Sequence, residues 1–297
     1  MIHAALKDQG HTFALAAREL WNVHHAFSGT PVQYYQAPFK QGPTPLLATH
    51  ECHAHLLYSA GYADPQELTV LVSAWIGVLG SFRPDLVIFD HSPTALLASR
   101  CLPVRRVIIG SGFLVPTKGQ PMGVLPDAPT GPGPLSRMTN DEAAVLGNIN
   151  KVLAAFGLEK LDALQDMYAV ADDEVLLTSE ELDPFRRGPV DYSSVWPARS
   201  FPEQNWPEHS NRRIFAYLDD FPGLKQLLTD LESLDATTLI YAPGIPSKIR
   251  DAHTSARLEF LDGPTNLEHL AKNATCSFPM EPTRAWTGSC SRGFPRS

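Results

Sequence analysis

The chain has 297 residues, of which 43% are hydrophobic and 19% are charged, and its formal net charge is −8 at pH 7. This length is sufficient for two domains, and the composition is that of a folded globular protein rather than a disordered one. The acidic balance and the absence of a basic stripe exclude the usual kind of nucleic-acid-binding surface, and no apolar run reaches the length of a membrane span.

The N-terminal residues and the spacing of the cysteines indicate the cellular compartment of the protein. The first residues lack the basic start and the apolar core of a signal peptide. Cysteines stand at positions 52, 101, 276 and 290, without the spacing of a metal site or a disulfide framework. We therefore expect a cytoplasmic protein in a reducing environment.

Strands and helices are predicted to alternate along the N-terminal half of the chain. A first helix is expected to end at Gly10, and the clearest amphipathic helix covers residues 66–82, where Leu68, Trp75 and Leu79 recur at helical spacing. The other predicted helices are residues 17–27, 95–100 and 139–156, and the predicted strands are residues 11–16, 31–36, 86–89, 106–109 and 175–178. This alternation indicates a doubly wound α/β fold with a parallel sheet.

Two proline-rich segments interrupt the alternation. Residues 116–134 are predicted to form a long loop, and residues 184–207 are interpreted as an interdomain linker. A second α/β series follows, with strands at 213–218, 237–241 and 258–261 and helices at 223–234 and 266–272. Residues 277–297 contain no Leu, Ile or Val, and we expect them to be a disordered tail. The predicted domains are therefore residues 1–195 and 213–276, joined by a linker over 196–212.

The most informative segment for function is residues 86–98, LVIFDHSPTALLA. A short buried strand is predicted to end at Asp90, and Ser92 and Pro93 are predicted to begin a helix. The carboxylate would then lie at the carboxyl end of a strand, which is where open α/β sheets bind their ligands. The alternative is that Asp90 only caps the helix that follows.

Three further segments contain possible ligand-binding residues. Gly110-Ser111-Gly112 lacks the third glycine and the following helix of a dinucleotide fingerprint, so it is either a tight turn or the wall of a ligand cleft. Residues 241–246 are predicted to form a second turn at a strand end, which is again either a tight turn alone or part of a ligand cleft. Residues 50–55, HECHAH, lack the histidine spacing of a zincin, which favours a polar helix start over a metal site.

The order of these segments matches a known superfamily. Gly10-His11 before a strand, the run over 86–98, VIIGSGF over 107–113, IFAYL over 214–218, TLIYAPGIP over 238–246 and LEFLD over 258–262 resemble the UDP-glycosyltransferase superfamily with the GT-B fold. The bacterial MGT, or YjiC-like, group is the most similar, and the resemblance covers residues 2–275. It implies two Rossmann-like domains, of which the first would lack its first strand and the second would be incomplete.

The resemblance also implies roles for individual residues. The N-terminal domain of such enzymes binds an acceptor and the C-terminal domain binds a nucleotide sugar, here a UDP-sugar. In inverting members a histidine after the first strand deprotonates the acceptor hydroxyl, and an aspartate at the end of a later strand orients it. Asp90 matches this aspartate, and the implied substrate contacts are Ser92, Thr94, Gly112, Phe113, Tyr217 and Gly244.

Two departures from the family pattern limit the expected activity. The family's catalytic histidine would precede Met1, and its donor-binding His-Gly-Gly region would follow a strand near residues 274–277. We therefore expect hexosyl transfer from a nucleotide sugar to a small-molecule hydroxyl in intact relatives, and negligible transfer by this chain. No metal and no cofactor beyond the nucleotide-sugar co-substrate are expected. The alternatives are an inactive fragment that only binds a ligand or partner, and a His-rich metal protein.

Overall fold

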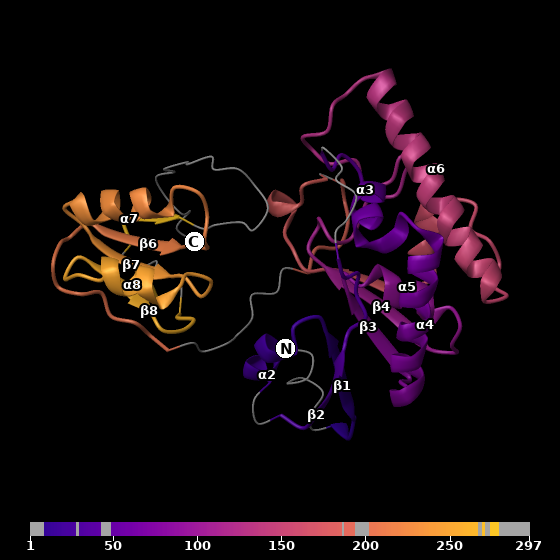
Figure 1. The fold of residues 1–297 in the computed structure, drawn as a ribbon, viewed down its shortest axis with the longest axis horizontal. Helices are drawn as coiled ribbons and strands as arrows, with labels where there is room; N and C mark the ends of the chain where they lie inside the picture. Colours follow the sequence, from indigo (N-terminus) through magenta and orange to yellow (C-terminus); the bar gives the residue numbers. More distant parts are fainter. Residues whose placement is uncertain are drawn as a thin grey trace. The chain divides into compact units, whose positions relative to one another are not determined.

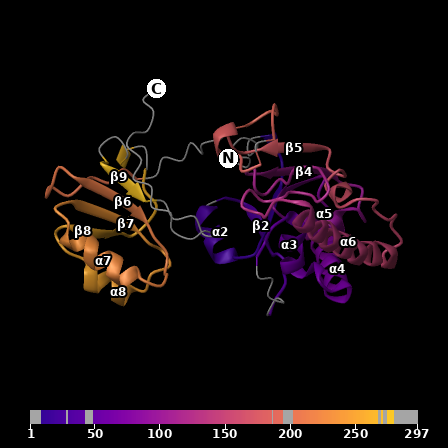
Figure 2. The ribbon, with the colours of Figure 1, turned by 90° about the horizontal axis from the view of Figure 1, so that it is seen from above.

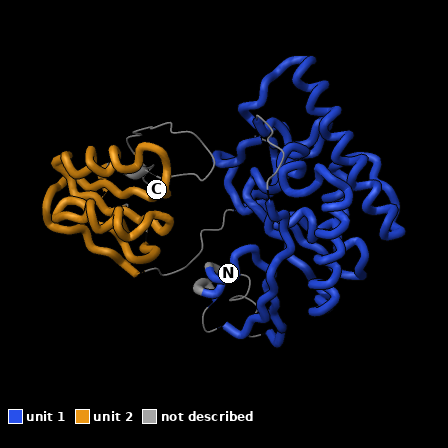
Figure 3. The backbone as a smooth tube through the Cα atoms, viewed as in Figure 1, with its two compact units in different colours: residues 1–197 blue, residues 198–297 orange. Residues whose placement is uncertain are grey.

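The chain folds into two separate α/β units, residues 1–197 and residues 198–297, in a computed structural model (Figure 3). The structure describes residues 9–27, 30–42, 49–185, 187–193, 202–266, 269–270 and 274–278. The predicted helix that ends near Gly10 lies mostly outside these ranges. The division falls at residue 197, and residues 202–212 of the expected linker belong to the second unit, where Trp206 is buried against Leu239 and Leu261.

Unit 1 contains two parallel sheets that share one hydrophobic core. A two-stranded sheet pairs β1 with β2, and a three-stranded sheet has the order β3-β4-β5. Figure 2 shows α3, α4, α5 and α6 to one side of β4 and β5. The elements, in chain order (Figure 1), are β1 Phe13–Ala17, α2 Leu20–Ala26, β2 Val32–Gln36, α3 His53–Leu57, η2 Tyr58–Tyr62, α4 Pro65–Phe82, β3 Leu86–Asp90, α5 Pro93–Ser99, β4 Arg105–Gly110, α6 Pro132–Ala155, η3 Leu164–Met167, β5 Asp173–Leu176 and η4 Glu180–Leu182.

Helix α4 illustrates how the sequence specifies these elements. Asp64 caps its N-terminus by accepting a hydrogen bond from the Gln66 backbone N–H over 2.8 Å, and Pro65 takes the first helical position. The apolar stripe of the sequence is buried, including Leu68 and Trp75. The helix ends at Arg83 in a left-handed conformation, as helices commonly do.

Unit 2 is one parallel sheet of order β8-β7-β6-β9. Side chains alternate across the sheet: Ile240 joins the cluster that includes α7, whereas its neighbour Leu239 joins a second cluster with Trp206 and Leu261. Helices α7 and α8 lie on the same side of the sheet in Figure 2. The elements are β6 Arg213–Tyr217, α7 Leu224–Ser233, β7 Thr237–Tyr241, α8 Ser247–His253, β8 Leu258–Leu261 and β9 Cys276–Phe278.

The structure corrects the start of α6, the absence of a predicted α8 and the start of the expected tail. Helix α6 begins at Pro132 rather than 139, because prolines are tolerated in a first helical turn. Helix α8 was not predicted. Residues 277–278 of the expected tail form part of β9, which pairs with β6 through backbone hydrogen bonds that need no Leu, Ile or Val. Residues 269–270 of the predicted helix 266–272 are helical, and most of its other residues lie outside the description.

Among the described residues, no helix combines the length and the apolar character needed to cross a membrane.

Candidate functional site

The turn after β3 places Asp90 at the carboxyl end of a parallel strand. Asp90 is the last residue of β3, pairs in register with Ile109 of β4, and is exposed to solvent. His91 follows with a φ of 41°, in the left-handed region, and Ser92 then occupies the N-cap of α5. Since the N-cap is Ser92, the alternative in which Asp90 caps the helix is wrong. Ser92 itself makes no side-chain capping bond.

The Thr94 side chain is hydrogen-bonded within the protein. Its hydroxyl donates a hydrogen bond to the Tyr62 hydroxyl over 3.4 Å, and Tyr62 is fully buried. Burial raises the pKa of Tyr62 far above its ordinary value, so this phenol remains neutral. Contact of Thr94 with a substrate therefore remains a prediction, and it would require exchange of this hydrogen bond.

A buried histidine–tyrosine pair lies beneath the turn. His53 Nε2 and the Tyr168 hydroxyl are 2.5 Å apart, and the two rings meet edge to face. Burial, and secondarily the nearby His91, lower the pKa of His53 to about 3, so its imidazole is neutral at physiological pH. Tyr168 also contacts a small surface depression together with His91, Ser92 and Leu114. Tyr168 of this uncharged pair thus borders the β3 turn.

The loop after β4 is held by a cluster that the sequence did not reveal. The side chain of Asp183 is fully buried, and its carboxylate accepts hydrogen bonds from Arg187 Nε over 2.7 Å and from the Tyr192 hydroxyl over 2.9 Å. We call these three residues the Asp183 cluster. Arg187 also donates to the carbonyl oxygens of Gly112 and Val115. The only sequence signal was the Asp–Arg spacing of four residues, inside a segment interpreted as a linker.

Gly112 and Phe113 are therefore packed into the loop after β4. Gly112 is buried, and a Cβ atom at this position would collide with the Asp183 carboxylate. Phe113 is partly buried in the same loop. The tight-turn interpretation accounts for Gly112, and a substrate contact by either residue remains a prediction.

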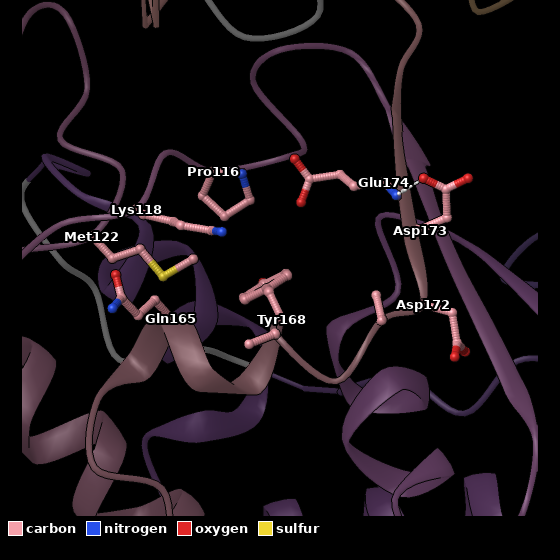
Figure 4. A pocket seen from close by; sticks show the side chains of 10 residues that line it. Pro116, Lys118, Met122, Gln165, Tyr168, Asp172, Asp173 and Glu174 are labelled. Atoms are coloured by element: carbon pink, nitrogen blue, oxygen red, sulfur yellow. Dashed lines mark hydrogen bonds between the residues drawn. The ribbon is translucent and has the colours of Figure 1, made fainter. Parts of the chain in front are cut away.

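A larger cavity of about 400 Å³ lies between the proline-rich loop, η3 and the start of β5 (Figure 4). Lys118 from the proline-rich loop and Glu174 from β5 point towards one another above Tyr168, whereas Asp172 and Asp173 point away. Gln165 fixes the loop, because its side-chain oxygen accepts a hydrogen bond from the Gly119 backbone N–H over 3.1 Å. None of the predicted site residues lines this cavity.

The histidine-rich tract has partners within the protein. His55 Nε2 lies 3.0 Å from Asp141 of α6, and Glu51 pairs with Arg137 of the same helix. His50 contacts Ser59. Within the described ranges no group of three or more His, Cys, Asp or Glu residues is arranged to hold a metal ion. The tract joins α3 to α6, which is a structural role.

In unit 2, Tyr217 is the last residue of β6, and Gly244 lies in the segment that follows the neighbouring strand β7. The Tyr217 ring stacks on Tyr241, with centroids 5.5 Å apart, and Tyr217 is 41% exposed. Gly244 packs tightly against the Asp219 side chain, so a larger residue would not fit. The chain order of the strands reverses between β6 and β9, and ligands of open parallel sheets bind at such a point, beyond the carboxyl ends. Tyr217 lies at that end of β6.

The predicted residues thus form one group in each unit. Asp90 ends β3, Ser92 follows it, and Gly112 and Phe113 follow the adjacent β4, so these four lie at neighbouring strand ends of unit 1. Tyr217 ends β6 and Gly244 follows the adjacent β7 in unit 2. His91 and the Asp183 cluster are the additions that the structure makes.

Comparison with known proteins supports the fold. No protein-family model and no curated protein matches the sequence. Among solved structures, the chain is similar to the spinosyn rhamnosyltransferase SpnG, with 13% sequence identity, a TM-score of 0.50, and coverage of 94% of this chain and 70% of that chain. With the same coverage, the glycosyltransferase SnogD from Streptomyces nogalater gives 16% identity and a TM-score of 0.48. SsfS6 from Streptomyces sp. SF2575, solved with thymidine diphosphate, gives 16% identity and a TM-score of 0.47. The architecture is that of the GT-B glycosyltransferases.

Proposed function

We propose, against the expectation of negligible transfer that the missing family motifs raised, that the protein binds a nucleotide sugar, with UDP-sugars as the first donors to test, and transfers the hexosyl group to a hydroxyl of a small-molecule acceptor. The observation that carries this proposal is the exposed Asp90 carboxylate at the carboxyl end of β3, in a chain with the GT-B architecture. The bacterial YjiC-like enzymes are the group with which we compare it.

The reaction requires one proton transfer and one displacement. A base removes the acceptor proton, the acceptor oxygen bonds to the anomeric carbon, and the bond from that carbon to the nucleoside diphosphate breaks. A carboxylate beside the base stabilises the positive charge that the base acquires. Asp90 would take this role, and its exposure and its position beside the turn residue His91 support the assignment.

Unit 2 would bind the donor at its strand-order reversal. The exposed Tyr217 ring offers an aromatic surface at the end of β6, next to the loop that contains Asp219. Stacking of an aromatic base on a tyrosine is favourable without any further hydrogen bond. A Tyr217→Ala variant should therefore weaken nucleotide binding, whereas the exposed Leu234→Ala should not.

The test measures donor binding and turnover separately in the full chain. Calorimetric titration with UDP-glucose and TDP-glucose reports binding, and release of nucleoside diphosphate with 4-methylumbelliferone as the acceptor reports transfer. Asp90→Asn should lower turnover by about 10²-fold or more while donor affinity is retained. Asp85→Asn, the same substitution at the other end of the strand, is the matched control. If neither donor binds, the proposal is wrong.

A further inference from the structure

The cavity of about 400 Å³ in unit 1 has a size that is common among small-molecule sites, which range from about 300 to 1,000 Å³. It lies between the proline-rich loop, η3 and the start of β5, whereas Asp90 lies at the carboxyl end of β3. Tyr168 forms one wall of the cavity and also borders the β3 turn. The cavity is therefore a candidate ligand site next to the Asp90 turn but built from other residues.

Hydrogen bonds to other elements fix the walls of this cavity. The Gln165 side chain accepts a hydrogen bond from the Gly119 backbone N–H, and the carboxylate of the buried Glu142 in α6 accepts one from the Met122 backbone N–H. The Tyr168 hydroxyl is bonded to a buried histidine. Since the walls are already ordered, a ligand that enters the cavity pays little for ordering them.

Two opposite charges face each other across the cavity. The Lys118 ammonium extends from the proline-rich loop and the Glu174 carboxylate extends from β5, above the ring of Tyr168 (Figure 4). Both residues are exposed, and neither takes part in an ion pair with another described side chain. A ligand between them can pair with the cation on one wall and with the anion on the other.

The two other carboxylates at this edge of β5 already have partners. Asp172 accepts a hydrogen bond from the Arg106 backbone N–H over 2.7 Å, and Asp173 accepts one from the Glu174 backbone N–H over 2.8 Å. Figure 4 shows both side chains directed away from the cavity. The cavity therefore presents one positive and one negative charge, and a ligand that complements it has no net charge.

Apolar atoms line the space between the two charges. Pro116 and Met122 are buried on the side of the proline-rich loop, and Tyr168, Ala169 and Ala171 line the side of η3 and β5. Burial of an apolar ligand surface against such walls is favourable. The lining thus favours a ligand with an apolar body and a charged group at each of two positions.

We propose that this cavity binds a small zwitterion with an apolar body, of the size of an amino acid or a dipeptide. Its carboxylate pairs with Lys118 and its ammonium pairs with Glu174. A ligand with a single charge would pair with one wall and leave the opposite charge without a partner in the cavity. The inference is independent of the proposed function, because it uses different side chains and requires no nucleotide sugar.

Calorimetric titration of the full chain with L-phenylalanine and with L-leucyl-L-phenylalanine tests the proposal. The amide of each compound lacks the carboxylate, and the deamino form of each lacks the ammonium. We expect at least one of the two zwitterions to bind, and we expect its amide and its deamino form to bind about tenfold more weakly, since each loses one charge-assisted hydrogen bond.

Two variants assign the charges to their partners. Lys118→Met should weaken binding of the zwitterion and of the deamino form while leaving binding of the amide unchanged. Glu174→Gln should weaken binding of the zwitterion and of the amide but not of the deamino form. Glu159→Gln and Lys160→Met, which change exposed charges outside the cavity, are the controls and should bind all three compounds as the wild-type chain does.

Unchanged melting temperatures would show that the variants fold, as expected for substitutions of exposed side chains. If the wild-type chain bound neither zwitterion, the proposal would be wrong. It would also be wrong if the forms with one charge bound as tightly as the zwitterion, or if both cavity variants kept the wild-type affinity. None of these results would bear on the proposed function, which the titrations with UDP-glucose and TDP-glucose test separately.

Discussion

Replacing Arg187 by methionine should destabilise unit 1 more than any change of a single exposed charge. Its side chain is 9% exposed, and its Nε pairs over 2.7 Å with the carboxylate of Asp183, whose side chain is fully buried. Methionine would preserve much of the volume but leave that carboxylate without its counter-charge. Removal of one partner of a buried ion pair costs about 3–5 kcal/mol.

Substitutions of other residues should lower the free energy of unfolding by smaller amounts. Tyr192→Phe removes one hydrogen bond to the Asp183 carboxylate and leaves Arg187 in place, so its cost should be about 1.5–3 kcal/mol. For a unit of this size, each kcal/mol corresponds to a shift of roughly 2–4 °C in the melting temperature, so Arg187→Met should lower it by roughly 6–20 °C. The exposed Asp162→Asn should stay within about 0.5 kcal/mol of wild type.

Urea unfolding followed by circular dichroism, with calorimetry to separate the transitions of the two units, measures these differences. Only the transition of unit 1 should move, because every residue of the cluster belongs to that unit. If Arg187→Met and Asp162→Asn had the same free energy of unfolding, the ion pair would have no net role and the reasoning would be refuted.

The same cluster predicts a dependence on pH. Burial alone would raise the pKa of Asp183, but hydrogen bonds from the Phe185 backbone, Arg187 and Tyr192, together with the Arg187 charge, hold it below its ordinary value. A carboxyl with a lowered pKa in the folded state stabilises the protein above its unfolded pKa, and this stabilisation is lost as the pH falls through the folded value. The difference between wild type and Asp183→Asn should therefore be constant near neutral pH and shrink below about pH 4.

Three further substitutions, two of them with a comparison variant, test other parts of the fold by unfolding free energy. Asp64→Ala removes the N-cap of α4 and should cost about 1 kcal/mol. Leu228→Ala empties a fully buried position of α7 and should cost about 2–5 kcal/mol, against little change for the exposed Leu234→Ala. Gly112→Ala forces a methyl group against a buried carboxylate and should cost about 1–3 kcal/mol, whereas Gly147→Ala in α6, with open space at its Cβ, should stabilise by about 1 kcal/mol.

The regular elements could be predicted because their signals are local. The stripe on α4 predicted a helix over 66–82 and the structure has Pro65–Phe82, while β7 and β8 lie where their apolar runs placed them. Errors in the predicted helix bounds occurred where one residue type is compatible with two kinds of structure. The prolines before residue 139 were interpreted as loop, yet Pro132 and Pro134 lie in the first turn of α6, where their missing N–H groups have no partner to lose.

The candidate site could be predicted only in part, because its contacts join distant segments. Asp90 was found from the end of an apolar run, which is a local feature. The bond between His53 and Tyr168 spans 115 residues, and Arg187 reaches the carbonyl oxygen of Gly112 across 75 residues. Neither pair has a spacing that a single sequence reveals. The left-handed His91 was equally hidden, since no local rule requires histidine to adopt it.

These distant contacts give the proline-rich segment after Asp183 a role near the site. Arg187 fixes the carbonyl oxygens of Gly112 and Val115, which flank Leu114, and the Leu114 backbone interacts with the imidazole of His91. The position of that backbone therefore depends on a side chain from a segment whose composition indicated only a linker. A substitution at Arg187 would act on the surroundings of His91 as well as on stability, and composition alone is thus a poor guide to which segments of this chain support the candidate site.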